Sequence, residues 1–156
     1  DKDAGDRNRT SPFAFTGNRF EFRAVGSNQS VAGPLVTLNT ILADSLNWMA
    51  SELETKLSSG FGLEEGALAV LKTTITNHGA VVFGGNGYSE EWHHMAVAER
   101  GLENLRTTAD ALPVLERPDI RELFERTGVL SAVELQSRFE VYAEQYILAI
   151  DVHSLT

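Results

Sequence analysis

The chain has 156 residues, the size of one ordinary domain, and 42% of them are hydrophobic, which is enough to build a core. Thirteen Lys and Arg stand against twenty-two Asp and Glu, so the net charge of −9 argues against general nucleic-acid binding. The absence of cysteine excludes disulfides, cysteine zinc sites and thiolate catalysis, and it fits a reducing compartment. With no signal peptide and no apolar run long enough for a bilayer, we expect a cytoplasmic protein without membrane contact.

Positive charge gathers near the start of this acidic chain. Arg7 and Arg9 precede a connection marked by Pro12 and Gly17, and two more arginines follow within the stretch 18–23. Four arginines therefore lie within seventeen residues. Because the global charge is negative, this local excess predicts a site for a small anion.

The first predicted strand is Asn18–Val25, which begins Asn-Arg-Phe-Glu-Phe-Arg. Its period of two would place Arg19, Glu21 and Arg23 on one face and the two phenylalanines on the other. Glutamate oxygens suit a hard cation such as magnesium, and arginine suits phosphate or carboxylate. The alternative is a solvated face whose charges pair with neighbouring strands, at about 0.2 to 1 kcal/mol each.

Helices dominate the sequence after a polar turn at 26–29. Leucines at helical spacing predict a long amphipathic helix from Gly33 to about Leu57, and a second runs from Leu63 to residue 77 or 78, where Gly79 offers a left-handed cap. We expect a short second strand at 79–84. One or two strands rarely form a stable sheet alone, and the first residue is Asp1 rather than methionine, so we expect a piece of a longer polypeptide.

The glycine-rich stretch 83–88 leads into a helix that Ser89 can cap. It lacks the endings of a P-loop and of a dinucleotide fingerprint, so we interpret it as a turn. Glu90 and His94, one turn apart, invite a metal hypothesis, but no second correctly spaced histidine follows, and an exposed polar face is the better interpretation.

Three more helices are expected before the end of the chain. The first is short, spans about 107–112 and ends at Pro113, and the second starts at Pro118 and runs to about residue 127. Ser131 and Glu134 form a capping-box pattern before the last helix.

Several of these stretches match a known family. Residues 8–23 (NRTSPFAFTGNRFEFR) and 26–32 (GSNQSVA) closely resemble the end of the catalytic domain of type III glutamine synthetases. The stretch 85–92 (GNGYSEEW) and the run from Arg100 to the end resemble the tail of that family, so the resemblance covers essentially the whole chain.

The resemblance implies ATP-dependent joining of glutamate and ammonia. In that family ATP phosphorylates the glutamate side chain, and ammonia then displaces phosphate from γ-glutamyl phosphate. By similarity Glu21 is a ligand of the divalent metal, magnesium or manganese, and Arg19 lies on the ATP phosphates. Arg23 contacts glutamate or the transferred phosphoryl group, and Arg9 contacts the same anionic centre; both are implied catalytic residues. Metals and arginines suit phosphoryl transfer because they neutralise the charge on the phosphoryl oxygens.

One departure from related enzymes bears on these roles. Type I relatives carry another arginine in a longer connection, whereas Thr10–Asn18 contains none. The shorter connection is itself what resembles type III. The division of substrate and phosphate between Arg9 and Arg23 therefore stays open.

The sequence thus predicts an α+β fragment, with one or two strands of a glutamine-synthetase-type catalytic sheet followed by a mainly helical region. We expect residues 1–33 to end the sheet region and carry the active-site strand, and residues 34–156 to form the helical part. The family implies a ring-shaped homo-oligomer. With one plausible metal ligand and no adenine pocket or ammonia site, the isolated chain is expected to be inactive. The alternatives are a helical assembly module, which does not need the ionic strand, and a related ligase joining glutamate to another amine.

Overall fold

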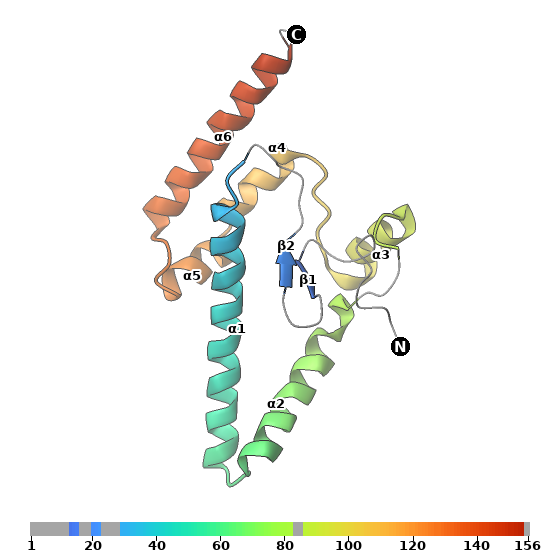
Figure 1. The fold of residues 1–156 in the computed structure, drawn as a ribbon, viewed down its shortest axis with the longest axis vertical. Helices are drawn as coiled ribbons and strands as arrows, with labels where there is room; N and C mark the ends of the chain where they lie inside the picture. Colours follow the sequence, from blue (N-terminus) through green and yellow to red (C-terminus); the bar gives the residue numbers. More distant parts are fainter. Residues whose placement is uncertain (1–12, 16–19, 23–28, 83–85, 155–156) are drawn as a thin grey trace. The chain divides into compact units, whose positions relative to one another are not determined.

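The structure, a computed structural model, describes residues 13–15, 20–22, 29–82 and 86–154 (Figure 1). In chain order the elements are β1 (Phe13–Phe15), β2 (Phe20–Phe22), α1 (Ala32–Ser58), α2 (Leu63–His78), η1 (Gly79–Val81), α3 (Glu90–Arg100), α4 (Thr108–Ala111), η2 (Leu112–Glu116), α5 (Pro118–Arg126) and α6 (Ala132–Ser154). Two compact units divide the chain, Asp1–Ser30 with Ala67–Asn104 and Val31–Gly66 with Leu105–Thr156. The first contains the strands, most of α2, η1 and α3, and the second contains the other helices.

Helix α1 confirms the long helix predicted from leucine spacing. Pro34 lies in its first turn, where a missing backbone N–H costs nothing because that group has no partner within the helix. The helix ends at Ser58, and Gly60, at φ 92°, turns the chain toward α2. Gly66 then lies so close to α1 that an added Cβ would come within 3.1 Å of the Leu53 side chain. A larger residue at position 66 would therefore fit only if the Leu53 side chain shifted by a few tenths of an ångström.

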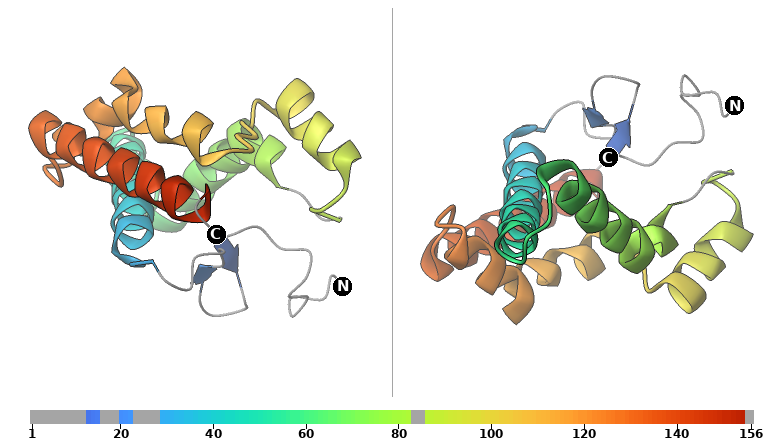
Figure 2. Two further views of the ribbon diagram at one scale, coloured as in Figure 1. Left: turned by 90° about the horizontal axis from the view of Figure 1, so that it is seen from above. Right: turned by 90° about the horizontal axis from the view of Figure 1, so that it is seen from below.

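The core of the second unit is built from α5, α6 and the loop between them. Phe124, Leu130 and Leu135 are 3%, 8% and 2% exposed, and they form one cluster. Partly buried hydrophobic residues from α1, η2 and α5 pack against it, namely Val36, Leu115 and Ile120. Each fully buried side chain of this size contributes about 1.5–3 kcal/mol. Elements α4, η2 and α5 accordingly lie along α6 (Figure 2).

An ion pair joins α1 to α5 beside this core. Arg126 donates from Nε to Asp44 Oδ1 at 3.0 Å and from Nη2 to Oδ2 at 2.7 Å. This two-pronged contact lowers the pKa of Asp44, first through the hydrogen bonds and then through the positive charge, and it raises the pKa of Arg126. Because both side chains are partly exposed, the pair orients the two helices more than it stabilises them.

Helix α6 begins with the predicted capping box. Ser131 Oγ accepts a hydrogen bond from the Glu134 backbone N–H at 3.3 Å, and Glu134 Oε2 accepts one from the Ser131 backbone N–H at 2.8 Å. The Ser131 hydroxyl also donates to Glu134 Oε2 at 2.7 Å. Hydrogen bonds to the carboxylate lower the pKa of Glu134, the one from the Ser131 backbone most of all. The capping box is confirmed, and it starts α6 next to the core residue Leu135.

In the first unit, α3 ends at a left-handed glycine, whereas α2 runs directly into the short helix η1. Helix α3 begins after Ser89, whose hydroxyl accepts from the Trp92 backbone N–H at 3.2 Å, and it ends at Gly101, at φ 65°. The prediction that Gly79 caps α2 in the left-handed conformation is wrong, because within the described residues positive φ angles occur at other glycines. Gly79 instead opens η1, and its carbonyl accepts from the Val82 backbone N–H at 3.1 Å.

The prediction of an α+β fragment with strands of a catalytic sheet is wrong. The described residues are mostly helical, and the β-structure among them is a ladder of three residue pairs between β1 and β2. Of the strand predicted at 18–25, the structure describes Phe20–Phe22, which form β2, and the strand predicted at 79–84 is replaced at its start by η1. Within the described part of the chain, these two short strands have no further strand partner, which a stable sheet needs, and the turn at Gly79 uses backbone groups that a ladder would use.

Candidate functional site

The β1–β2 ladder contains the backbone of one predicted site residue. Its antiparallel register sets Glu21 opposite Ala14, with Phe20 and Phe22 opposite the two phenylalanines of β1. Arg9, Arg19 and Arg23 lie outside the described residues, so of the four predicted site residues the structure places the backbone of Glu21.

The register bears on the alternative interpretation of the charged strand. Cross-strand ion pairs need a charged residue opposite or diagonal to the carboxylate. The residue paired with Glu21 is Ala14, and β1, Phe13–Phe15, contains no charged residue. The pairing with β1 therefore gives no support to the interpretation in which Glu21 forms an ion pair with this neighbouring strand.

The loop before α3 is held by its own polar groups. The Tyr88 backbone N–H donates to Asn86 Oδ1 at 3.1 Å, and His93 Nε2 lies 3.1 Å from the Gly87 carbonyl oxygen. A carbonyl can only accept, so Nε2 carries the proton. His93 Nδ1 is buried, and among the described residues it has no hydrogen-bond partner. His93 thus orders the end of the glycine-rich stretch.

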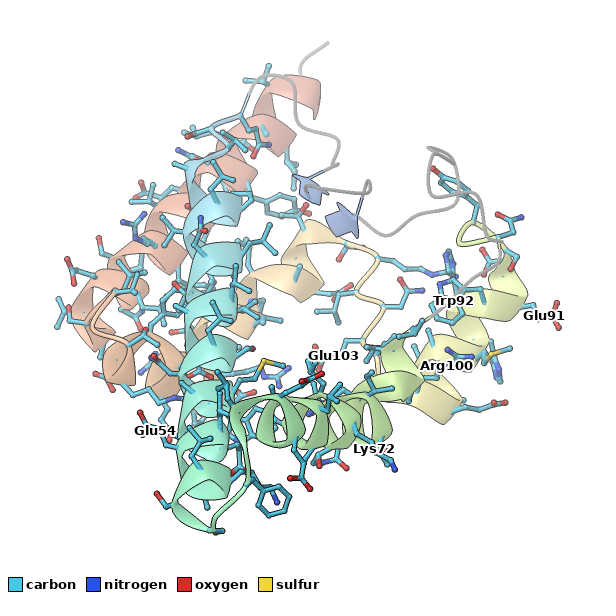
Figure 3. The ribbon with its side chains drawn as sticks, turned by 60° about the horizontal axis from the view of Figure 1, so that its bottom comes forward. Glu54, Lys72, Glu91, Trp92, Arg100 and Glu103 are labelled. Atoms are coloured by element: carbon cyan, nitrogen blue, oxygen red, sulfur yellow. The ribbon has the colours of Figure 1, made fainter. Side chains whose placement is uncertain are left out.

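Arg100, the last residue of α3, links this helix to η1 and the residue after it. Its Nη1 donates to the carbonyl oxygens of Ala80 and Val82, each at 3.0 Å, and its guanidinium lies 5.2 Å from the centre of the Trp92 ring (Figure 3). Sequence reasoning did not single out Arg100. The available signal was its spacing of eight residues from Trp92, about two helical turns, which puts both side chains on one side of α3.

The described residues offer no ready-made metal centre. Across residues 13–15, 20–22, 29–82 and 86–154 there is no group of three or more His, Asp or Glu side chains that could hold a metal ion. Glu90 and His94, which were considered above as a ligand pair, belong to no such group. In the same part of the chain, each helix is too short or too polar to cross a membrane.

Comparison with known proteins identifies the family. Residues 67–156 match the family described as Glutamine synthetase C-terminal domain, and this match spans more than half of the chain. The chain belongs to the glutamine synthetases. This match confirms the prediction that the chain is a C-terminal portion of a glutamine synthetase, and the first of the relatives below confirms the resemblance to the type III enzymes.

Three curated relatives align along almost the whole chain. The "Type-3 glutamine synthetase" of Dictyostelium discoideum is 46% identical over 98% of this chain and 20% of its own length. The "Glutamine synthetase" of Bacteroides fragilis is 38% identical over 97% of the chain and 21% of its own length, and that of Butyrivibrio fibrisolvens is 42% identical over 99% and 22%. The chain thus spans about a fifth of the length of these glutamine synthetases.

Proposed function

We propose that the complete polypeptide is a type III glutamine synthetase, which joins glutamate and ammonia through γ-glutamyl phosphate with cleavage of ATP. The observation that carries the proposal is the 46% identity to the Type-3 glutamine synthetase of Dictyostelium discoideum over 98% of the chain. This alignment is too long to be confined to the C-terminal domain at 67–156, and it extends over the arginine-rich stretch 7–23.

Within this proposal Glu21 binds the divalent metal, magnesium or manganese. When bound, the metal neutralises charge on the phosphate oxygens. A carboxylate oxygen is a suitable ligand for such a hard cation, and β1, the strand that pairs with β2, contains no charged residue that would compete for it. One carboxylate does not hold a catalytic metal alone, so further ligands come from the rest of the polypeptide.

The arginines of the same segment act on the anionic reactants. Arg19 binds the ATP phosphates, Arg23 contacts glutamate or the transferred phosphoryl group, and Arg9 binds at the same centre. Fixed guanidiniums stabilise a phosphoryl group best when they are in place before charge develops, because no reorganisation is then needed during reaction. The excess of four arginines over one carboxylate in residues 7–23 supports this assignment.

Glutamine formation tests the proposal directly. We expect ATP- and ammonia-dependent glutamine synthesis by the complete gene product, measured with glutamate as substrate, and none by the 156-residue chain alone. No glutamine from the complete protein would refute the proposal. A different glutamyl amide, formed with another amine, would favour the related ligase. The same preparation, measured by light scattering, should be a homo-oligomer, as the proposed ring assembly requires.

A further inference from the structure

Asn86 and Gly87 form a chemically labile pair at the end of the glycine-rich stretch. Of the asparagines in the sequence, Asn86 is the one that a glycine follows. The backbone nitrogen after an asparagine can attack the side-chain amide, and a following glycine leaves the approach unhindered because it has no Cβ. The pair is therefore the place in this chain where such an attack meets the least steric resistance.

The turn 86–89 puts a hydrogen-bond donor on the side-chain oxygen of Asn86. The Tyr88 backbone N–H donates to Asn86 Oδ1 at 3.1 Å. An N–H can only donate, so the atom that faces it is the amide oxygen rather than the nitrogen. This oxygen takes up negative charge when a nucleophile adds to Cγ, and a donor already in place stabilises that charge. The Tyr88 amide therefore favours attack on Asn86 Cγ.

Two further donors face the backbone carbonyl of Asn86, which belongs to the same peptide group as the Gly87 nitrogen. The Ser89 backbone N–H donates to this carbonyl oxygen at 3.3 Å, and the Ser89 hydroxyl donates to it at 3.1 Å. When the Gly87 nitrogen loses its proton, amide resonance shares the negative charge with that oxygen. The two donors therefore stabilise the nucleophilic form of Gly87.

The start of α3 holds this turn in place. His93 Nε2 lies 3.1 Å from the Gly87 carbonyl oxygen, and Ser89 Oγ accepts from the Trp92 backbone N–H at 3.2 Å. All of these contacts lie within residues 86–93, in the first unit. The geometry that activates the pair is therefore local to the turn and the first turn of the helix.

We propose that Asn86 is a site of spontaneous modification, at which the turn 86–89 promotes the conversion of its own asparagine to aspartate and isoaspartate. The Gly87 nitrogen gives its proton to water and bonds to Asn86 Cγ. The Cγ–Nδ2 bond then breaks, and Nδ2 leaves as ammonia with a proton taken back from water, which closes a succinimide ring. Water opens the ring at Cγ to give aspartate, or at the backbone carbonyl carbon to give isoaspartate. The net reaction consumes water and releases ammonia, without oxidation or reduction.

The products change the start of α3. Both replace a neutral amide by a carboxylate, just before a first turn that already contains Glu90 and Glu91. Isoaspartate also lengthens the main chain by a methylene group and turns the carbonyl that Ser89 contacts into a side carboxylate. We expect the cap at Ser89 to loosen, with faster amide hydrogen exchange in the first turn of α3.

Mass spectrometry of the complete protein tests the proposal. The native protein is incubated at neutral pH beside the same protein unfolded in guanidinium chloride, and the peptide that contains residue 86 is analysed for replacement of NH2 by OH and for isoaspartate. A fold normally slows this reaction by restricting the backbone. We expect instead that the native rate at Asn86 equals or exceeds the unfolded rate, and a native rate below it would overturn the proposal. Asn86→Gln, which keeps the amide but needs a larger ring, is the matched control and should stay unmodified.

Ser89→Ala separates donor stabilisation from simple flexibility. The substitution removes one donor to the Asn86 carbonyl and also loosens the cap of α3. If the donors promote the reaction, the native rate should fall by about fivefold, the effect of one lost hydrogen bond, and Ser89→Thr should restore it. A rate that is unchanged or rises would overturn the role given to the turn. Circular dichroism verifies folding, and neither measurement requires turnover, so a failure of the proposed function would leave the result unaffected.

Discussion

The arginine-rich segment and the helical second unit use charge in opposite ways. Residues 7–23 contain four arginines and one glutamate, so positive charge is in excess within this segment. In the second unit the arginines meet carboxylates of the same unit: Arg126 pairs with Asp44, Arg117 with Asp119, and Arg121 with Glu116. Paired charges organise local structure, whereas a local excess of arginine is suited to binding an anion, which is the role proposed for residues 7–23. Substitutions that change the charge of the first region should change turnover, and those in the second unit should change stability.

Replacement of Glu21 should have the largest effect. We expect Glu21→Ala in the complete protein to reduce metal-dependent turnover by roughly 100- to 1,000-fold, comparable to the loss of one group that stabilises the transition state. Glutamine formation is measured against magnesium and manganese concentration. Its pair residue, Ala14, offers no replacement carboxylate.

Phe22→Leu is the matched control for Glu21→Ala, since it changes the neighbouring position of β2 without changing charge. We expect it to alter mainly stability, with turnover per folded enzyme close to that of the wild type. Unchanged rate and magnesium dependence in Glu21→Ala would contradict the assignment of Glu21 as a metal ligand.

Truncation of a core side chain should lower the stability of the second unit rather than act directly on turnover. Phe124 is 3% exposed in the cluster of α5 and α6, so Phe124→Ala should lower the free energy of unfolding by about 3–5 kcal/mol through lost burial and an unfilled cavity. Amide hydrogen exchange of α5 and α6 in the complete protein measures this locally. Val133→Ala is the control, because Val133 is 79% exposed and its truncation should leave hydrogen exchange almost unchanged. If Phe124→Ala and Val133→Ala reduce the protection of α5 and α6 equally, this cluster is not the stabilising core.

Local signals predicted the helices of this chain well. The spacing of leucines correctly predicted α1, Ser89 predicted the start of α3, and the pair Ser131 and Glu134 predicted the start of α6. Each of these signals is satisfied within one or two turns of the chain. Their outcome therefore does not depend on the rest of the polypeptide.

The sheet could not be predicted in the same way. A strand needs partners, and β2 pairs only with β1 within the described residues, although sequence patterns suggested strands at 18–25 and 79–84. Contacts of Arg100 with Ala80 and Val82 cross about twenty positions of sequence, which no local pattern reveals. The candidate site was found through the family resemblance and through charge, and the roles of Arg9, Arg19 and Arg23 stay predictions.

Loss of the α6 cap should have a smaller effect than loss of the core. Ser131→Ala removes the hydroxyl that accepts from the Glu134 backbone N–H, which should cost about 1 kcal/mol. Hydrogen exchange should increase at the first turn of α6, next to Leu135. Ser131→Thr, which keeps a capping hydroxyl that can also donate to Glu134, should restore most of the protection; if Ser131→Ala matches the wild type, the cap does not stabilise the helix.

The ion pair between α1 and α5 should give the smallest effect, and it should depend on pH. The pKa of Asp44 is lowered in the folded state, first by its hydrogen bonds with Arg126. Its stabilisation is therefore present above the unfolded pKa, near 4, and is lost as pH falls through the lower folded pKa.

Asp44→Asn should thus reduce the protection of α5 at neutral pH and at low salt, and the difference from the wild type should vanish in strong acid. Glu122→Gln is the matched control, because Glu122 is more exposed and lies 3.8 Å from Arg126. An Asp44→Asn effect that is independent of pH and salt would mean that Asp44 acts through packing. In that case, the proposed contrast between the paired charges of this unit and the arginine-rich composition of residues 7–23 would lose its support.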